Sequence, residues 1–406
     1  MRTNMFKLTQ ALKYTLPFLV ATSVYATSNA LDIQERASDG AQCIVQATPT
    51  LSFTSSQWIW TTELASPNGN APVGSRAFRK TFLSPQGKTP SFLTIGFAAD
   101  NAATLWVNGN SIVTQSAWFN PGSYCVSLEN CDCGFLIAFN ATNTGGPAGL
   151  LVDAVVTYTD GSTSPIVSDS SWRTTTGGIP NGFQQSNFDD SAWETAETEG
   201  GNGVAPWGHV QPAGGNNPQS LATSQWIWTN EPSPGLYPPG ARAFRYTMTL
   251  PAGHTSGTAT VMIDVDNQYS LYINGVFVGT GTNFLTAQKY VAAVQGPQLV
   301  FAVYAQNTAT VPNPAGLLAS IQVTSQDNLS YCSNCNSTTS FVTDNSWKAF
   351  PGPVPSGFEQ PGFDDSAWPQ ATMEGQNGVP PWNNIAAPTT VTTGGTPLPG
   401  APAGSA

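Results

Sequence analysis

The residues best suited to bind a ligand are aromatic rings and amides that recur at matching places in two halves of the chain. In each half a segment that alternates apolar and polar residues ends in Asn-Gly. By the two-residue period of a strand, Trp106 shares a face with Asn108, and Tyr272 shares a face with Asn274. A ring that covers C–H groups beside an amide that bonds hydroxyls is the chemistry of a sugar site. The alternative is that another segment covers this face and both rings are core.

A second group of candidates comes directly before these segments. The pairs are Asp100-Asn101 in the first half and Asp266-Asn267 in the second. Their side chains can brace a turn, or they can bind a sugar hydroxyl or calcium. Calcium takes six to eight oxygen ligands, several of them carboxylates. Only the second half has another acid close by, Asp264, so Asp264 and Asp266 are weak calcium candidates.

Aromatic residues in loop-like sequence form a third group. Trp118 and Phe119 lie in the segment Gln-Ser-Ala-Trp-Phe-Asn, and the matching region of the second half offers Phe284. No apolar run stands beside these rings, which favours exposure and makes them candidates for ligand contact; the alternative is that they do not contact a ligand.

The acids and histidines do not form a recognisable catalytic site. Each half has two adjacent carboxylates, and neighbours on an extended segment point to opposite sides. We therefore expect them to cap a short turn. Neither His209 nor His254 has a counterpart in the other half, and no nucleophile elbow, phosphate loop or zinc-protease motif occurs. We expect no catalytic residue. The adjacent acids are Asp189, Asp190, Asp364 and Asp365.

Composition narrows the class of protein. Only 9% of the 406 residues are charged, and the formal net charge is −11. With 13 Lys and Arg, a nucleic-acid partner is excluded, because that affinity comes mainly from neutralising phosphates. Long helices need many more charged residues, whereas 40% hydrophobic residues argue against disorder. These values, with 39 Gly and 32 Pro, indicate a β-rich protein with many turns.

An internal repeat organises the chain. Gln57–Thr61 recurs as Gln225–Thr229, and six further motifs recur in the same order at offsets of 166 to 175 residues. We therefore expect two β-sandwich repeats, at 55–210 and 223–386, joined by a linker at 211–222. The Asn-Gly dipeptides predict tight hairpins. The recurring motifs are R-A-F-R, D-N, N-G, P-A-G-L-L, F-D-D-S-A-W and N-G-V-x-P-W.

This ordered set of motifs resembles the galactose-binding-domain-like jelly-roll modules attached to glycoside hydrolases such as α-L-rhamnosidases and β-galactosidase-type enzymes. The resemblance covers nearly all of both copies. It implies an all-β fold of two tandem jelly-roll-like β-sandwich domains. Such modules serve as sugar binders, calcium-dependent lectins or spacers. They share no single binding motif, so no binding residue is carried over.

The two ends predict an exported protein. Residues 1–30 have a positive start, a short apolar run and small residues at a cleavage site, as in a secretory signal peptide. Residues 31–54 are expected to be an N-terminal extension. The Pro/Gly/Thr-rich segment 387–406 is expected to be a disordered, mobile tail. No stretch is long and apolar enough to span a membrane.

The six cysteines fit structural disulfides in a secreted protein. Sequence alone does not fix their pairing, although the short spacing favours a local Cys332–Cys335 bridge. The other four would then pair among themselves. These are Cys43, Cys125, Cys131 and Cys133. Three sequons are expected to be glycosylation acceptors on surface loops, namely Asn140, Asn328 and Asn336.

Together these observations favour a secreted, non-catalytic, lectin-like protein with two similar sites for a polysaccharide or glycan. Calcium is a candidate cofactor, and association with the cell wall is a further candidate. The main alternative is a structural or adhesion protein that acts through protein contacts. A glycoside hydrolase with an unrecognised site is a third, and it would need two carboxylates about 5–9.5 Å apart in a cleft.

Overall fold

A computed structural model describes residues 48–64, 70–128, 134–214, 219–231, 235–327 and 335–405. All regular structure in these ranges is β-strand and no helix is present, so the all-β prediction is confirmed. No helix in the described ranges could cross a membrane. The predicted signal peptide and most of the N-terminal extension lie outside the described residues, as do Asn328 and four of the six cysteines.

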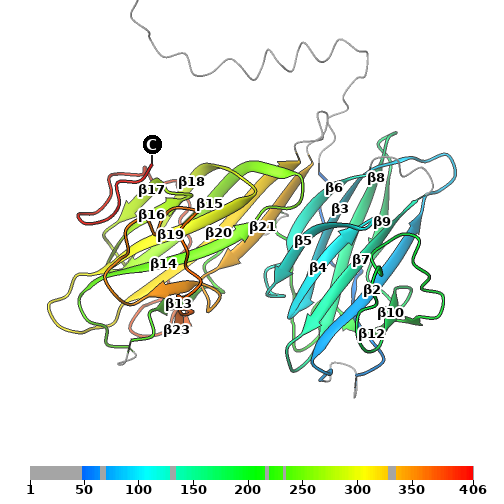
Figure 1. The fold of residues 1–406 in the computed structure, drawn as a ribbon, viewed down its shortest axis with the longest axis horizontal. Coiled ribbons are helices and arrows are strands. Elements are labelled where there is room, and N and C mark those ends of the chain that lie inside the picture. The colour runs from blue at the N-terminus through cyan, green and yellow to red at the C-terminus, as the bar shows by residue number, and fades with distance from the viewer. Residues whose placement is uncertain are drawn as a thin grey trace, which may run out of the picture. The chain divides into compact units, whose positions relative to one another are not determined.

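The first repeat is a sandwich of two antiparallel sheets, which we call the N-terminal sandwich (Figure 1). One sheet has the order β12 (Glu197–Gly201), β1 (Gln57–Trp60), β8 (Gly149–Tyr158), β3 (Pro90–Asp100), β6 (Gly122–Ser127), with β9 (Thr163–Val167) also paired to β8. The other has the order β11 (Glu194–Thr195), β10 (Arg173–Thr175), β2 (Gly74–Leu83), β7 (Gly134–Asn143), β4 (Ala102–Val107), β5 (Asn110–Ser116).

The second repeat, the C-terminal sandwich, has the same plan. One sheet contains β21 (Asn336–Val342), β20 (Gly316–Asp327), β13 (Gln225–Trp228) and β23 (Thr372–Gln376), with β15 (His254–Asp266) paired to β20 and β18 (Gln288–Gln295) paired to β15. The other has the order β17 (Val276–Gly281), β16 (Gln268–Ile273), β19 (Gln298–Asn307), β14 (Gly240–Thr249), β22 (Lys348–Phe350).

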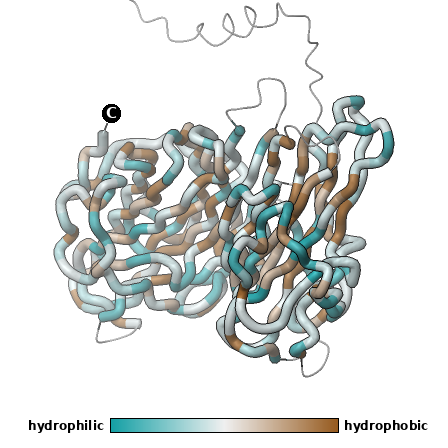
Figure 2. Tube along the Cα trace, turned by 45° about the vertical axis from the view of Figure 1, so that its right-hand side comes forward, coloured by the Kyte–Doolittle hydropathy of each residue, from teal (hydrophilic) through white to brown (hydrophobic). Residues whose placement is uncertain are grey.

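Each sandwich has its own hydrophobic core between its two sheets. Central strands such as β3 and β19 are buried along most of their length, and in Figure 2 brown stretches of the tube lie on the strands. In the repeated Gln-Trp-Ile-Trp strand a β-bulge follows the first tryptophan. Trp58 and Trp226 therefore pack outside the main cores, in the clusters of Trp207 and Trp382, whereas Trp60 and Trp228 belong to the cores. All four rings of the repeated strand are fully buried. The duplication therefore produced two separately packed units.

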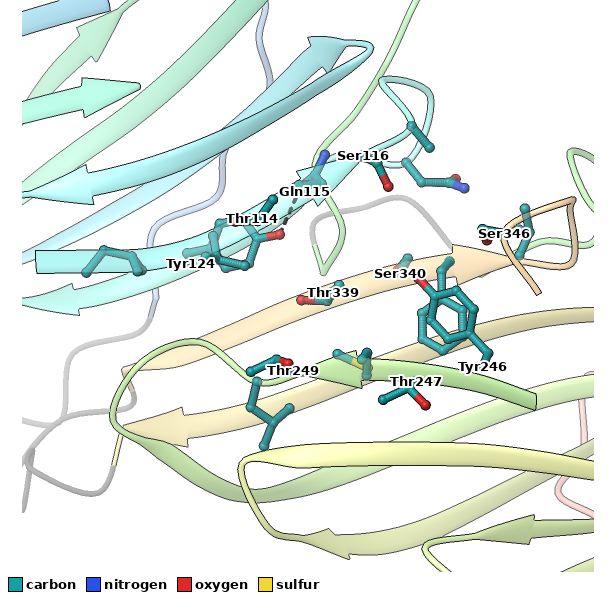
Figure 3. Close-up of a pocket in the computed structure, with 18 of the residues that line it drawn as sticks. Thr114, Gln115, Ser116, Tyr124, Tyr246, Thr247, Thr249, Thr339, Ser340 and Ser346 are labelled. Carbon is teal, nitrogen blue, oxygen red and sulfur yellow. Dashed lines mark hydrogen bonds between the residues drawn. The ribbon is translucent and has the colours of Figure 1, made fainter. Parts of the chain in front are cut away.

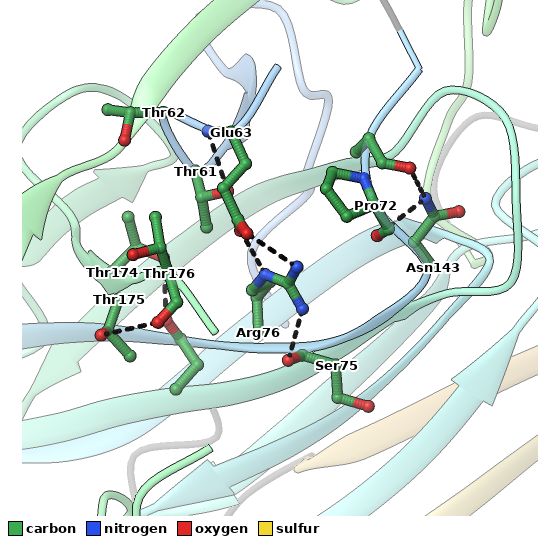
Figure 4. A network of polar contacts seen from close by, with 12 residues as sticks. Thr61, Thr62, Glu63, Pro72, Ser75, Arg76, Asn143, Thr174, Thr175 and Thr176 are labelled. Carbon is green, nitrogen blue, oxygen red and sulfur yellow. Dashed lines mark hydrogen bonds and ion pairs between the residues drawn. The ribbon is translucent and has the colours of Figure 1, made fainter. Parts of the chain in front are cut away.

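The repeated Arg-Ala-Phe-Arg motif supplies two buried ion pairs in each sandwich. Arg76 donates to Glu63, and its guanidinium holds the pKa of that carboxyl below its usual value (Figure 4). Arg79 donates to Asp190 at 2.6 Å, while Asp189 accepts from the backbone N–H of Ser191. The equivalent residues of the C-terminal sandwich make the same contacts. The adjacent acids therefore hold loops in place, as expected.

The two sandwiches share one sheet, because β6 pairs with β21 across them. The pairing is antiparallel and joins Ser123 to Thr338. Beside it, Cys125 forms a disulfide with Cys335, 210 residues away in the sequence. The prediction of a local Cys332–Cys335 bridge is therefore wrong. Short spacing misled it, because the fold brings two distant strand edges together.

Two further expectations about exposed segments are not met. Asn140 and Asn336 lie in strands β7 and β21 and not in loops. The C-terminal tail is docked on the C-terminal sandwich: Leu398 is buried, the carbonyl of Pro402 accepts from Tyr272, and Ser405 donates its N–H to the carbonyl of Gly275. Composition alone misses this docking, because it rests on one apolar side chain and several backbone hydrogen bonds.

Candidate functional site

The predicted ligand residues fall into two groups at opposite ends of a strand in each sandwich. In the N-terminal sandwich Asp100 and Asn101 precede β4, and Asn108 follows it. Six residues of strand separate the groups, about 20 Å at ~3.3 Å per residue. The fold therefore does not bring all the candidates into one site.

The Asn-Gly group forms hairpin turns. Asn108 and Asn274 have φ angles of 47° and 50°, the left-handed region that these turns require. The side chain of Asn108 accepts from the N–H of Leu136 at 2.8 Å, and that of Asn274 accepts from the N–H of Val300 at 2.7 Å. Both amides therefore brace the neighbouring strand.

The rings beside these amides pack into the protein. Tyr272 is fully buried and donates its hydroxyl to the carbonyl of Pro402 at 2.5 Å. Trp106 is half-buried and meets the ring of Phe183 edge to face, with 5.5 Å between centroids. The core alternative therefore holds for Tyr272, and Trp106 has most of its ring covered by the segment that carries Phe183.

At the other end, each Asp-Asn pair holds the tryptophan that closes its sandwich. Trp207 donates its indole N–H to Asp100 at 2.9 Å and stacks on Trp58, with 4.3 Å between ring centroids. In the C-terminal sandwich, Trp382 donates to Asp266 at 2.9 Å and stacks in the same way. Burial raises the pKa of both carboxyls, against the indole hydrogen bond.

The asparagine of each pair braces the next loop. Asn101 accepts from the backbone N–H of Thr144 at 2.7 Å, and Asn267 accepts from that of Thr308 at 2.9 Å. The Asp-Asn peptide bond is cis in both sandwiches. The Asp-Asn pairs are thus used by the fold itself.

The weak calcium candidate consists of Asp264 and Asp266. Asp264 is fully buried, and burial raises its pKa to about 7, with a further contribution from Asp266. Within the described ranges no group of three or more His, Cys, Asp or Glu is placed to hold a metal ion.

The loop that carries Trp118 and Phe119 packs against the Asp-Asn end of the N-terminal sandwich. Ala117 donates its backbone N–H to the carbonyl of Asn101 at 3.2 Å. Trp118 packs into the cluster around Trp207, whereas Phe119 is 36% exposed. The structure therefore brings the second and third groups of candidates together and leaves one aromatic ring open to solvent.

A cavity of about 400 Å³ lies beside this exposed ring. It is bounded by the Phe119 loop, by the segments that link the two repeats, and by strands β20 and β21 of the C-terminal sandwich. We call it the Phe119 pocket. No Asp, Glu, Lys or Arg lines it. Its polar groups come from Asn120, His209, Gln211, Gln219, Ser220, Thr223, Ser320, Gln322 and Ser340.

Sequence reasoning found Phe119 but missed most of this lining. Apart from Asn120 and Pro121, the lining residues lie 90 or more positions further along the chain, in and around the linker and in strands of the second repeat. They have no aromatic or charged signature, and only the joining of β6 to β21 brings them beside Phe119. No local sequence signal could have identified them.

The equivalent surface of the C-terminal sandwich differs in two ways. By the common strand register, Phe284 takes the place of Trp118 and Leu285 takes the place of Phe119. Phe284 is partly buried in the cluster around Trp382, and Leu285 is 64% exposed. An exposed aromatic ring therefore stands at this position in the N-terminal sandwich alone.

A second cavity, of about 530 Å³, lies between β5 of one sandwich and β14 and β21 of the other (Figure 3). Hydroxyl groups dominate its labelled lining, and the ring of Tyr246 stacks on Phe341 with 4.2 Å between centroids. Its one carboxylate is Asp344, which accepts from the backbone N–H of Ser346 at 2.8 Å. Neither this cavity nor the Phe119 pocket contains a pair of carboxylates.

The fold and these surfaces define a tandem pair of jelly-roll modules, and comparison with known proteins agrees. No family model matches the chain. An α-L-rhamnosidase of Streptomyces avermitilis is 28% identical over 368 residues, which cover 81% of this chain and 33% of that enzyme. The resemblance to modules of glycoside hydrolases is therefore confirmed, and the chain spans about a third of the length of this relative.

Two solved structures extend the comparison. A lectin from Pleurotus ostreatus, determined in complex with GalNAc, is 32% identical in sequence; the match covers 86% of this chain and all of that one, with a TM-score of 0.40. The S. avermitilis α-L-rhamnosidase complexed with L-rhamnose is 24% identical, covering 87% of this chain and 34% of the enzyme, with a TM-score of 0.36.

Proposed function

We propose that this protein is a secreted, non-catalytic carbohydrate-binding protein and that the Phe119 pocket holds the sugar. The observation that carries the proposal is an exposed aromatic ring at the edge of a pocket lined by hydroxyls and amides without any formal charge. A pyranose presents one apolar C–H face and several hydroxyls. The ring of Phe119 suits the first, and the amides and hydroxyls suit the second.

The chemistry of the pocket disfavours other ligand classes. Nucleotides and other phosphorylated ligands need cationic or helix-terminal partners, and the lining offers only His209. Acid–base hydrolysis of a glycoside needs two carboxylates, and the lining has none. The lectin determined with GalNAc adds a first ligand to test.

Secretion is part of the proposal. Its support is the signal-like sequence of residues 1–30 and the disulfide that joins Cys125 to Cys335. Disulfides of this structural kind persist in oxidising compartments. Carbohydrates of a cell wall or of another cell's surface are the partners that such a protein would meet there.

The proposal is tested by Phe119→Ala, with Leu285→Ala as the matched control. Both variants truncate an exposed side chain at the same place in the repeat. Binding is measured by calorimetric titration with GalNAc and with the best ligand from a glycan array. We expect Phe119→Ala to weaken binding about tenfold or more, ~1.4 kcal/mol, and Leu285→Ala to change it little. Equal losses in both variants, or no sugar binding by the unmodified protein, would overturn the proposal.

A further inference from the structure

In each sandwich the last strand of one sheet lies beside the last strand of the other sheet, and together they form one side of the sandwich. This side is covered in both sandwiches, but by different parts of the chain. In the N-terminal sandwich these edges are β5 and β6, and the C-terminal sandwich covers them. The carbonyl of Ile112 in β5 accepts from the N–H of Ala252 at 3.0 Å, and Ser123 in β6 pairs with Thr338.

In the C-terminal sandwich the equivalent edges are β17 and β18, and the C-terminal tail covers them. By strand register, Val278 corresponds to Ile112, and Lys289 corresponds to Ser123. Thr392 donates its N–H to the carbonyl of Lys289 at 2.7 Å. The tail therefore occupies, on β18, the position at which β21 pairs with β6.

The tail also occupies the second contact position. Gly394 lies so close to β17 that a Cβ at this residue would be 2.7 Å from the carbonyl oxygen of Val278. Its own carbonyl accepts from the N–H of Thr280 at 3.1 Å. Two tail residues, Thr392 and Gly394, therefore lie against the same positions of β18 and β17 that the other sandwich contacts on β6 and β5.

The N-terminal sandwich keeps the elements that would dock on such a side. The docking turn of the C-terminal sandwich is Pro251-Ala252-Gly253, and Pro85-Gln86-Gly87 is its counterpart, closed by the same hydrogen bond at 3.0 Å. The docking strand β21 has its counterpart in β9, which among the described strands pairs only with β8 and has one edge without a partner strand. Thr163 of β9 corresponds to Thr338.

We propose that the β17–β18 side of the C-terminal sandwich is a latent interface for the N-terminal sandwich of a second copy of this chain, and that the tail blocks it. The interface repeats between molecules the contact that joins the two sandwiches within one molecule. Because it is head to tail, removal of the tail leads to open-ended or ring-shaped assemblies and not to a closed dimer. An uncovered strand edge is a ready template for such pairing.

The test removes residues 391–406 and measures mass by light scattering across a dilution series. We expect the full chain to stay monomeric and the shortened chain to associate as concentration rises. Removal of the tail also uncovers Tyr272. A second, full-length variant therefore keeps Leu398 and Pro402 in place and weakens only the contacts of the tail with β17 and β18, and it should also associate. Thr392→Pro removes the N–H donor, and Gly394→Ala introduces the clash with Val278. Val391→Ala, at an exposed tail residue, is the matched control and should remain monomeric.

A cysteine pair identifies the interface. Val291 in β18 corresponds to Cys125, and Asp160 before β9 corresponds to Cys335. With Val291→Cys and Asp160→Cys, the shortened chain should give a ladder of disulfide-linked oligomers on a non-reducing gel. Either substitution alone should not. A folded shortened chain that stays monomeric, association without the ladder, or an equal ladder from the full chain would each overturn the proposal.

Discussion

Asp264 marks a difference between the two sandwiches at the level of a single residue. It lies in β15, and the equivalent position in β3 of the N-terminal sandwich is Ala98. Both residues are fully buried, but only one carries a charge that burial opposes. Burial raises the pKa of Asp264 to about 7, far above its value of about 3.9 in an unfolded chain.

This difference makes stability depend on pH. Between about pH 4 and 7 the folded state binds a proton that the unfolded state has lost, so the free energy of unfolding falls as pH rises through this window. The slope has an upper limit of about 1.4 kcal/mol per pH unit. We expect Asp264→Ala to raise the melting temperature at pH 7 and to flatten its dependence on pH from 4 to 7.

The reverse substitution is the control for this prediction. Ala98→Asp puts a carboxyl at the same position of the other sandwich, and it should lower the melting temperature more at pH 7 than at pH 4. Thermal unfolding followed by fluorescence across this range measures both effects. A pH profile of Asp264→Ala that runs parallel to that of the unmodified protein would contradict the assignment.

The sequence allowed some residue roles to be predicted and concealed others. The recurrence of Asp100-Asn101 and of the closing Trp207 was visible, but not that one donates to the other, because 107 residues separate them. The exposure of Phe119 was predictable, since no apolar run surrounds it. The burial of Tyr272 under another segment was one of the two alternatives, and Phe358 provides part of that cover. The contribution of the low-complexity tail could not be predicted from composition.

At the scale of elements, buried arginines attach a long irregular segment to a sheet in each sandwich. Arg245 is 2% exposed and donates to Asp365 at 2.7 Å and to the carbonyl of Gln360 at 3.2 Å. Arg79 makes the same contacts in the N-terminal sandwich. These segments have almost no backbone ladder of their own, so the guanidinium satisfies several of their polar groups.

Removal of one such arginine should therefore destabilise its sandwich strongly. Arg79→Ala leaves the Asp190 carboxylate without its cation and several backbone carbonyls unpaired, and we expect a loss of about 3–5 kcal/mol in the free energy of unfolding. The matched control is Arg173→Ala, because Arg173 also donates to this kind of segment, at Trp193, but is exposed. It should cost about 1 kcal/mol or less. Urea unfolding compares the two, and similar losses would contradict the role assigned to burial.

The positions of strands and hairpins could be predicted from the sequence more readily than the pairing of strands that lie far apart in it. The repeated motifs and the Asn-Gly turns located most strands, because these signals are local. The pairing of β6 with β21 could not be predicted, since Ser123 and Thr338 are 215 positions apart and neither β6 nor β21 has a sequence that marks it as a joining edge. The Cys125–Cys335 disulfide depends on that pairing.

At the scale of the whole molecule, the junction between the sandwiches decides whether the Phe119 pocket exists. The junction consists of a short strand pairing, a few backbone contacts and one disulfide. The disulfide spans 210 residues. In the chain-entropy model, closing so long a loop lowers the entropy of the unfolded chain and raises its free energy by about 5 kcal/mol. Each core is complete without the other, so opening of the junction need not unfold either sandwich.

The double variant Cys125→Ser/Cys335→Ser tests this dependence. If the proposed sugar site is composite, loss of the disulfide lets the sandwiches part, and sugar affinity should fall toward that of Phe119→Ala while both sandwiches still unfold cooperatively. The double variant combined with Phe119→Ala should bind no more weakly than Phe119→Ala alone, because both changes remove the same site. Titration with sugar and fluorescence-detected melting measure the two properties. Unchanged affinity in the double variant would mean that the strand pairing alone holds the pocket together.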